Sequence, residues 1–331
     1  MKVFLTGGGG FLGGATAKRL REHGHEVRSF SRKPHAELAA LGVEHVQGDL
    51  GDRDAVVASA AGCDAIVHTA AKAGVWGHYP EFWRANVVGT RHVIDACRAH
   101  GIQRLVHTSS PAVVHRGGDI HGGDASLPLT DVYWTHYQET KAWAEREALA
   151  ANGPDLAVVA LRPHLIWGPG DPHMGPRIVS RVRNGRIALP GGGVNVIDTL
   201  YIENGADALV QALEALRPGA SLAGRAYFVT NGEPRAMRDM VLGIARAAGK
   251  DARVVAIPLP IARAAGSLLE STFRWVDSET EPLLTRFTVE YMASTHHFDI
   301  SAAERDFGWT PRVSIDEGFE ALRESYASSR T

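Results

Sequence analysis

Cysteine is nearly absent from this chain of 331 residues, which contains only Cys63 and Cys97. Both fall in segments expected to be regular structure, and their spacing fits no metal-binding motif. We therefore expect two buried, reduced thiols and no disulfide framework, as is usual in a reducing compartment. The 16 histidines include no H-x-x-x-H pair with a carboxylate on a plausible helix, so we expect no metal site.

Long hydrophobic runs and a strong net charge are missing as well. No uninterrupted apolar stretch reaches the roughly 20 residues of a membrane-spanning helix. The sequence begins directly with an expected core strand, so we expect neither a signal peptide nor an integral membrane segment. A formal net charge of −2 offers no basic surface for nucleic acid. These features are typical of a cytoplasmic protein of ordinary composition.

Glycine, in contrast, is concentrated near the start, in the stretch TGGGGFLGG at residues 6–14. An apolar run precedes it, and residues 15–23 follow without a helix breaker, which predicts a strand, a glycine turn and a helix. Such a turn lets the backbone approach a pyrophosphate at the helix N-terminus, although a plain structural turn is the alternative. Two motifs fit the turn, G-x-G-x-x-G at Gly8, Gly10 and Gly13, and T-G-x-x-G-x-x-G at Gly7, Gly10 and Gly13.

Strands and helices alternate through the first half of the chain. After the opening unit, the expected strands are 25–33, 43–50, 65–70, 104–110 and 157–163, and the expected helices are 54–60, 87–100 and 137–150. This alternation predicts an α/β protein with a Rossmann-type doubly wound parallel sheet. Ligands of such sheets bind at the carboxyl ends of the strands.

The regular alternation stops after residue 168. We assign 1–168 to a dinucleotide-binding domain, with 195–216 rejoining its sheet, and 169–194 with 217–331 to a smaller C-terminal α/β substrate-binding domain. Within that domain, the prolines and Arg263 of 254–270 interrupt an apolar segment, which favours a wall or lid for a hydrophobic substrate over membrane contact. Four arginines between 177 and 186 are either a solvated helix face or a guide for a carboxylate substrate.

Three side chains of the first half can carry chemistry. Tyr137 and Lys141 are spaced i, i+4, so they share one face of a helix. The strand 104–110 ends in the hydroxyl cluster Thr108, Ser109 and Ser110. A solvated surface pair and turn-capping hydroxyls are the alternatives.

Together these motifs resemble the extended short-chain dehydrogenases/reductases almost from end to end. The resemblance is carried by TGGGGFLG, GDL, NVVGT, TSS, YQETK and LRPHLIWGPGD. TAAKAGVWG, TSSPAVV, EPLLTR and FDISAAERDFGWTPRVSIDEGF are similar to the 3β-hydroxysteroid dehydrogenase branch. Within that branch, the sequence most resembles bacterial reductases of 2-alkyl-3-ketoalkanoic acids in long-chain olefin biosynthesis.

The resemblance implies a role for each side chain. Tyr137 exchanges a proton with the substrate oxygen, and Lys141 holds the cofactor ribose and favours tyrosinate. Ser110, the third hydroxyl of its cluster, binds the substrate oxygen. Pro111 departs from many members of the family and leaves Ser109 open as the alternative.

Cofactor preference is expected at the end of the second strand, at Ser31 and Arg32. No acid stands there to accept from a ribose 2′-hydroxyl, and a guanidinium suits a 2′-phosphate, so we expect NADP(H). Solvated loop charges are the alternative. The resemblance places His164 in the cofactor-binding loop beneath the carboxamide, with a structural or backbone role, and gives Asp49 a contact with the adenine amino group. It adds the cofactor-binding residues Gly7, Gly10, Phe11, Leu12, Gly13, Leu50, Ala70, Ala71, Lys141, Pro163 and Leu165.

The sequence thus predicts an NADP-dependent oxidoreductase that interconverts a β-keto and a β-hydroxy group on a hydrophobic acid. A 3β-hydroxysteroid or 4-carboxysterol dehydrogenase is the alternative enzyme. A non-catalytic NADP-binding redox sensor is a further alternative, although such proteins generally lack the Tyr/Lys pair. A homodimer and association with other enzymes of the same pathway both stay open.

Overall fold

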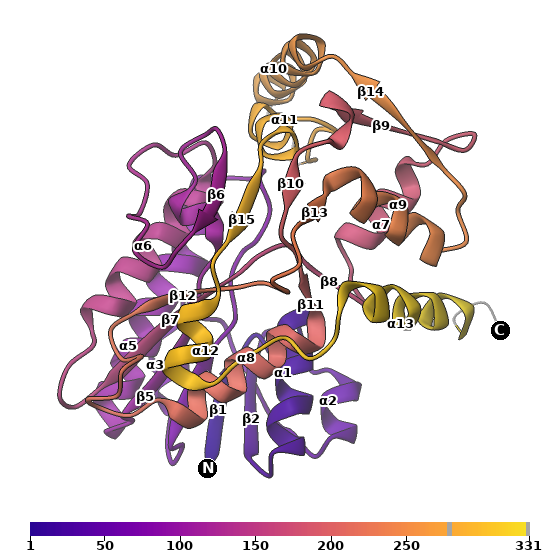
Figure 1. Ribbon diagram of the computed structural model, residues 1–331. Helices are drawn as coiled ribbons and strands as arrows, with labels where there is room; N and C mark the ends of the chain where they lie inside the picture. The colour runs from indigo at the N-terminus through magenta and orange to yellow at the C-terminus, as the bar shows by residue number, and fades with distance from the viewer. Residues whose placement is uncertain (277–279, 329–331) are drawn as a thin grey trace.

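The computed structural model describes residues 1–276 and 280–328. A seven-stranded parallel sheet forms the centre of its larger part (Figure 1). In spatial order its strands are β12 (Ala226–Val229), β7 (Ala157–Pro163), β5 (Arg104–Thr108), β4 (Ala65–His68), β1 (Lys2–Thr6), β2 (Glu26–Ser31) and β3 (Glu44–Gln47). Chain order runs outward in opposite directions from β1 and β4, so a ligand crevice is expected between their carboxyl ends. The predicted Rossmann-type fold is confirmed.

Helices cover both faces of this sheet, because side chains alternate along each strand. Val3 and Leu5 of β1 join one apolar core, and Phe4 joins the other. The first core is covered by α1 (Phe11–Glu22), α2 (Ala36–Ala40), α8 (Ile202–Ala215) and α12 (Ser301–Phe307). The second is covered by α3 (Arg53–Ala60), α5 (Gly89–His100) and α6 (His136–Ala150). Before α5 lie the short α4 (Tyr79–Phe82) and a π-helical turn (Trp83–Val88).

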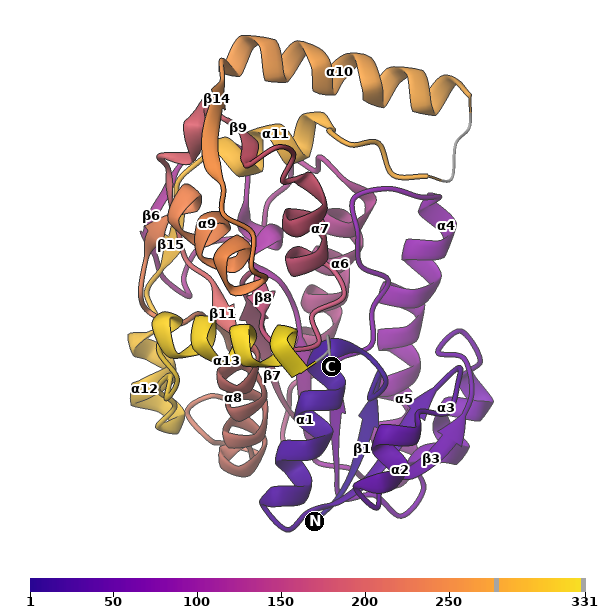
Figure 2. The ribbon, with the colours of Figure 1, turned by 90° about the vertical axis from the view of Figure 1, so that its right-hand side faces the viewer.

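The smaller part gathers short strands from distant regions of the chain (Figures 1 and 2). A four-stranded sheet contains, in order, β13 (Arg235–Ala236), β10 (Val196–Ile197), β15 (His296–Phe298) and β6 (Ile120–Gly123). Two pairs accompany it, β11 (Leu200–Tyr201) with β8 (Ile166–Trp167) and β14 (Arg253–Ile257) with β9 (Arg186–Pro190). Its helices are α7 (Met174–Arg181), α9 (Met237–Ala247), α10 (Leu259–Trp275), α11 (Arg286–Ala293) and α13 (Ile315–Ser328).

The sheet divides the chain differently from the expected domains at two points. β12, expected in the substrate-binding part, extends the main sheet, because its four buried residues pair in parallel with β7. Conversely, β10 and β11 pair within the small sheets. Leu200 of β11 and the helix α8 still pack on the main sheet. Residues 277–279 and 329–331 of the expected substrate-binding domain lie outside the described residues.

The prolines of segment 254–270 begin a helix and do not break one. Pro258 is the N-cap of α10, and Pro260 lies in its first turn. Backbone N–H groups there have no partner within the helix, so proline is tolerated and its fixed φ favours helix initiation. α10 therefore continues for 17 residues. Within the described ranges, no helix combines the length and apolar character needed to cross a membrane.

Candidate active site

The glycine turn between β1 and α1 leaves no room for side chains. Gly7 has φ of 74°, and a Cβ there would lie 2.7 Å from the Cα of Ala70. A Cβ on Gly13 would lie 2.0 Å from the carbonyl oxygen of Gly7. Gly10 is the N-cap of α1 and brings no side chain to the free amides of the first turn. The turn thus has the T-G-x-x-G-x-x-G shape, and the residues present fit a pyrophosphate at the helix N-terminus.

At the end of β2, Ser31 and Arg32 lie where the sequence predicts the adenosine ribose. The Ser31 hydroxyl donates a hydrogen bond to the Lys33 carbonyl at 2.8 Å. Arg32 is exposed, and its guanidinium has no carboxylate partner within residues 1–276 and 280–328. The imidazole of His35 lies directly over Gly9. No motif marks His35, so sequence reasoning missed this neighbour of the glycine turn.

The predicted adenine-side residues follow β3 and β4. Asp49 accepts a hydrogen bond from the Gly51 amide at 2.7 Å and pairs with Arg84 at 3.2 Å. Leu50 packs against Gly89 at the start of α5, with its Cβ 3.0 Å from the position a Cβ would take there. The Ala70 amide lies 3.3 Å from the Thr6 hydroxyl oxygen, so the ends of β1 and β4 are held side by side. Ala71, the next residue, is exposed.

Tyr137, Lys141 and Ser110 come together at the carboxyl end of β5. Tyr137 and Lys141 lie one turn apart on α6. The Lys141 ammonium donates a hydrogen bond to the Thr108 carbonyl at 2.5 Å. Ser110 follows β5 and hydrogen-bonds the phenol of Tyr137. Ser110 and Tyr137 thus bring two hydroxyl groups together, which suits proton transfer to or from an oxygen atom, and the Lys141 ammonium is held at the neighbouring Thr108 carbonyl.

Burial acts on both titratable groups of this cluster. It lowers the pKa of Lys141 from 10.5 to about 8, and the charge of Glu145 offsets only part of this shift. It raises the pKa of Tyr137, while the hydrogen bond from Ser110 opposes that rise. Tyr137 is therefore protonated at neutral pH and can donate a proton. Within residues 1–276 and 280–328, no carboxylate forms an ion pair with the Lys141 ammonium, so its charge favours any anion formed beside it.

The hydroxyl cluster is held by a residue that the sequence analysis did not single out. Gln138 is buried on α6, and its side-chain amide donates to the carbonyls of Ala112 at 2.8 Å and His115 at 2.6 Å. This fixes the turn after Ser110 against the helix that carries Tyr137. The Ser109 hydroxyl is buried and, among the described residues, has no hydrogen-bond partner. Of these two serines, Ser110 is the one that hydrogen-bonds Tyr137.

The loop after β7 contains Pro163, His164 and Leu165. His164 is buried, and burial holds its pKa well below the usual range. Its Nε2 lies 2.8 Å from the hydroxyl of Tyr291 on α11. Leu165 has φ of 45°, a left-handed conformation that costs a non-glycine residue roughly 1–3 kcal/mol. Tyr291, whose pKa is raised by burial and by nearby Tyr137, was missed because it lies far along the chain.

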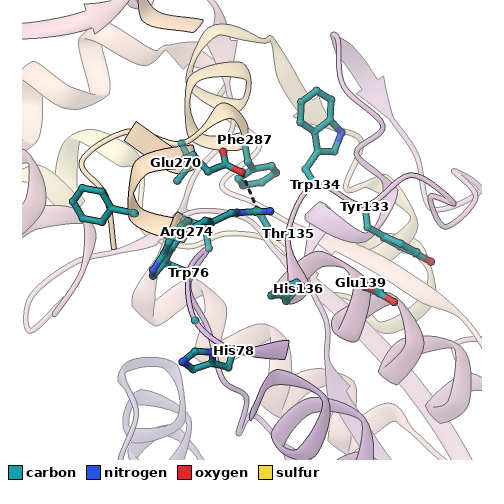
Figure 3. A pocket seen from close by; sticks show the side chains of 14 residues that line it. Trp76, His78, Tyr133, Trp134, Thr135, His136, Glu139, Glu270, Arg274 and Phe287 are labelled. Atoms are coloured by element: carbon teal, nitrogen blue, oxygen red, sulfur yellow. Dashed lines mark ion pairs between the residues drawn. The ribbon is translucent and has the colours of Figure 1, made fainter. Parts of the chain in front are cut away.

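A pocket of about 420 Å³ opens beside the first turn of α6 (Figure 3). Its aromatic walls are Trp76, Tyr133, Trp134, Phe273 and Phe287, and its polar lining includes His78, Thr135, His136, Glu139, Glu270, Arg274 and Thr285. Glu270 pairs with Arg274 at 2.9 Å and with Arg286 at 3.1 Å. Two guanidinium groups therefore share one carboxylate at the wall of the pocket.

Residues 4–261 match the model of the 3-beta hydroxysteroid dehydrogenase/isomerase family. The chain belongs to this family. This confirms the resemblance found in the sequence and makes the protein an oxidoreductase of the extended short-chain dehydrogenase/reductase type. The family match ends within α10, so Phe273, Arg274 and Phe287 of the pocket lie beyond it.

Two relatives and one solved structure align with this 3-beta hydroxysteroid dehydrogenase family chain over most of its length. The 2-alkyl-3-oxoalkanoate reductase of Stenotrophomonas maltophilia is 47% identical over 330 residues, covering 99% of this chain and 100% of the relative. The enzyme of the same name from Shewanella oneidensis is 42% identical and covers 98% and 86%. The solved structure of MoeE5 in complex with UDP-glucuronic acid and NAD is 25% identical, covers 99% and 100%, and has a TM-score of 0.76.

Within the described part of the chain, the arginines of α7 and the two cysteines, which the sequence analysis also considered, do not contact Tyr137, Lys141 or Ser110. Arg177 pairs with Glu281, and Arg181 donates to the Leu283 carbonyl at 2.8 Å, so both attach α7 to the segment before α11. Cys63 and Cys97 are separate buried thiols. Among the described residues, no group of three or more His, Cys, Asp or Glu side chains is arranged to hold a metal ion.

Proposed function

We propose that this member of the family reduces the keto group of a 2-alkyl-3-ketoalkanoic acid with NADPH, a step of long-chain olefin biosynthesis. The observation that carries the proposal is the cluster of Tyr137, Ser110 and Lys141 at the end of β5, beside an aromatic-walled pocket. Two relatives of 47% and 42% identity carry the name 2-alkyl-3-oxoalkanoate reductase, which supports this substrate class.

In the proposed reaction, the hydroxyls of Ser110 and Tyr137 both hydrogen-bond the keto oxygen. When bound, the nicotinamide supplies the hydride that reaches the carbonyl carbon. Tyr137 donates its proton to the oxygen as negative charge develops there. The Lys141 ammonium, held in place by the Thr108 carbonyl, stabilises the tyrosinate that is left. Gln138 keeps the Ser110 turn in register with α6.

The dinucleotide would be held by the crevice between β1 and β4. Gly7, Gly10 and Gly13 form the backbone cradle for its pyrophosphate, and Ser31 with Arg32 would bind the ribose 2′-phosphate. The NAD of the related MoeE5 complex supports a nicotinamide dinucleotide. Asp49, Leu50, Ala70 and Ala71 would line the adenine side, and Lys141 would also contact the second ribose.

We expect kcat/KM to rise steeply with substrate chain length. Each methylene buried in an apolar pocket contributes about 0.8 kcal/mol, or roughly fourfold in kcat/KM. Long α-branched β-keto acids should therefore be reduced far faster than short ones. The measurement is NADPH oxidation, together with NADP reduction in the reverse direction, across β-keto and β-hydroxy acids, sterols and UDP-sugars.

These substrates separate the proposal from its alternatives. Rates that do not change with chain length would contradict a pocket for hydrocarbon. A preference for 3β-hydroxysterols would assign the protein to the sterol-type members of its family. Cofactor binding without turnover of any of these substrates would identify a redox sensor.

A separate prediction concerns the preference between NADPH and NADH, which Ser31 and Arg32 at the end of β2 are proposed to set. Wild type should prefer NADPH over NADH by roughly tenfold to a hundredfold, because a hydrogen bond to a charged group contributes about 1.5–3 kcal/mol. Ser31→Asp combined with Arg32→Ala should reverse this preference, because the new carboxylate repels a 2′-phosphate and accepts from a 2′-hydroxyl.

The ratio of kcat/KM for the two cofactors checks this prediction. Lys33→Ala serves as the matched control, since it removes a neighbouring exposed cation and should change the ratio little. If the double variant keeps the wild-type ratio, the 2′-phosphate does not bind at Ser31 and Arg32.

A further inference from the structure

The imidazole of His35 reaches from the start of α2 onto the glycine turn. The helix α2 lies beside α1 (Figures 1 and 2). A Cβ on Gly9 would lie 1.8 Å from the Nε2 of His35, and 2.2 and 2.3 Å from the two ring carbons bonded to that nitrogen. Because Nε2 is the nearest ring atom, the tip of the ring points at the backbone of Gly9. His35 therefore brings a nitrogen atom to the residue before Gly10, the N-cap of α1.

The ring of His35 is available for a ligand. His35 is the N-cap residue of α2, but its side chain does not cap the helix. Within residues 1–276 and 280–328, neither ring nitrogen forms a hydrogen bond or an ion pair. The residue is half-buried, so the ring is neither enclosed in a core nor fully solvated. An imidazole in this position can donate an N–H to a bound group.

Two further polar side chains near the turn lack partners. The hydroxyl oxygen of Ser29 on β2 is buried, and it lies 2.4 Å from the position that a Cβ on Gly8 would take. His45 on β3 is the register partner of Ser29, so the two side chains share one face of the sheet. Among the described residues, the Ser29 hydroxyl and both ring nitrogens of His45 have no hydrogen-bond partner. Burial lowers the pKa of His45, and the nearby His35 adds to this shift.

Positive charge gathers on the same loop. Arg32 and Lys33 are exposed, and neither has a carboxylate partner among the described residues. The segment 31–40 contains one acid, Glu37, which is exposed in the first turn of α2. Asp49, which follows β3, already forms an ion pair with an arginine. The surroundings of His35 therefore favour a ligand group with more than one negative charge.

We propose that His35 binds the 2′-phosphate of NADP(H) and thereby contributes to the choice of cofactor. This inference rests on the proposed preference for NADPH, and it adds a third side chain to Ser31 and Arg32. A phosphate group presents several strong acceptor oxygens, whereas NAD has only a hydroxyl at that position. The imidazole over Gly9 supplies a donor beside the glycine turn, and the guanidinium of Arg32 supplies donors beside β2.

Titration calorimetry with two fragments of the cofactor tests the proposal. The fragment 2′,5′-ADP carries the 2′-phosphate and 5′-AMP does not, so the difference between their affinities isolates this group. Wild type should bind 2′,5′-ADP roughly tenfold to a hundredfold more tightly than 5′-AMP. His35→Phe keeps a ring over Gly9 and removes both nitrogens. It should weaken binding of 2′,5′-ADP about tenfold and change binding of 5′-AMP less than about twofold.

Two further variants serve as controls. His35→Gln retains a side-chain N–H, so it should recover part of the affinity for 2′,5′-ADP that His35→Phe loses. His121→Phe replaces an exposed histidine on β6 of the small sheet, and it should leave both affinities unchanged. Thermal unfolding curves of all three variants should match that of the wild type.

The results separate this inference from the proposed cofactor preference. If wild type distinguishes the two fragments and His35→Phe distinguishes them equally well, His35 does not bind the phosphate, and the preference set by Ser31 and Arg32 stands. Equal losses of affinity for both fragments would assign His35 to the adenosine or to the turn and would also overturn the proposal. A wild type that binds both fragments equally would contradict the NADPH preference, and this inference with it.

Discussion

Tyr137→Phe should lower kcat by about 10²–10⁴-fold, the range typical of a lost general acid. The phenylalanine ring keeps the packing of Tyr137 on α6 and removes only the hydroxyl that hydrogen-bonds Ser110. Binding of NADPH should therefore change less than about threefold, because the hydroxyl is proposed to act on the substrate oxygen. Steady-state kinetics and fluorescence titration with NADPH measure the two quantities.

Tyr291→Phe is the matched control, since Tyr291 is the second buried tyrosine near this site. Tyr291 lies on α11 and contacts His164. It has no proposed role in proton transfer, so the kcat of the Tyr291→Phe variant should fall far less. Equal losses of kcat in both variants would contradict the proposed role of Tyr137 as the proton donor. A Tyr137→Phe protein that loses cofactor affinity in proportion to its rate would show that the hydroxyl serves binding.

Lys141→Met should reduce kcat/KM at least about a hundredfold and yet make the protein without cofactor more stable. Burial lowers the pKa of Lys141 from 10.5 to about 8, a cost of roughly 3 kcal/mol for the folded cation. Methionine removes that cost and loses the hydrogen bond to the Thr108 carbonyl, worth about 1 kcal/mol. The unfolding midpoint should rise by several degrees.

The difference in stability between Lys141→Met and wild type should depend on pH. The unfolded chain binds the Lys141 proton more tightly than the folded protein, so wild-type stability gains on the variant as pH rises from about 8 to 10.5. The advantage of Lys141→Met should be largest at neutral pH and shrink across that window. Lys141→Arg, which keeps a charge, should show no such gain. A destabilised methionine variant at pH 7 would contradict a costly buried cation.

Much of the nucleotide-binding half could be predicted because its signals are local. The glycine turn lies between a strand and a helix that adjoin it in sequence, and Tyr137 and Lys141 are one helical turn apart. Ser110 follows its strand within two residues. Such features depend on short-range periodicity and turn chemistry, which a single sequence displays.

The walls of the pocket could not be predicted in this way. Trp76, Trp134, Phe273 and Phe287 come from separate parts of the chain and meet only through tertiary packing. A four-residue apolar strand such as β12 does not reveal which strand it will pair with. Similarly, Pro258 was interpreted as an interruption because proline breaks helices in their interior, and its place at the N-cap depends on where α10 begins.

The pairing of β15 with β6 joins His296 to Ile120 across 176 positions of the chain. Six strands of the large sheet lie within residues 2–163, so they can associate while synthesis continues. The small four-stranded sheet must wait for β15, because closing a long loop costs entropy that only late contacts repay. During translation, the small sheet therefore stays incomplete until residues 296–298 have been added. Any chaperone that binds the nascent protein would meet a formed nucleotide-binding sheet beside an incomplete small sheet.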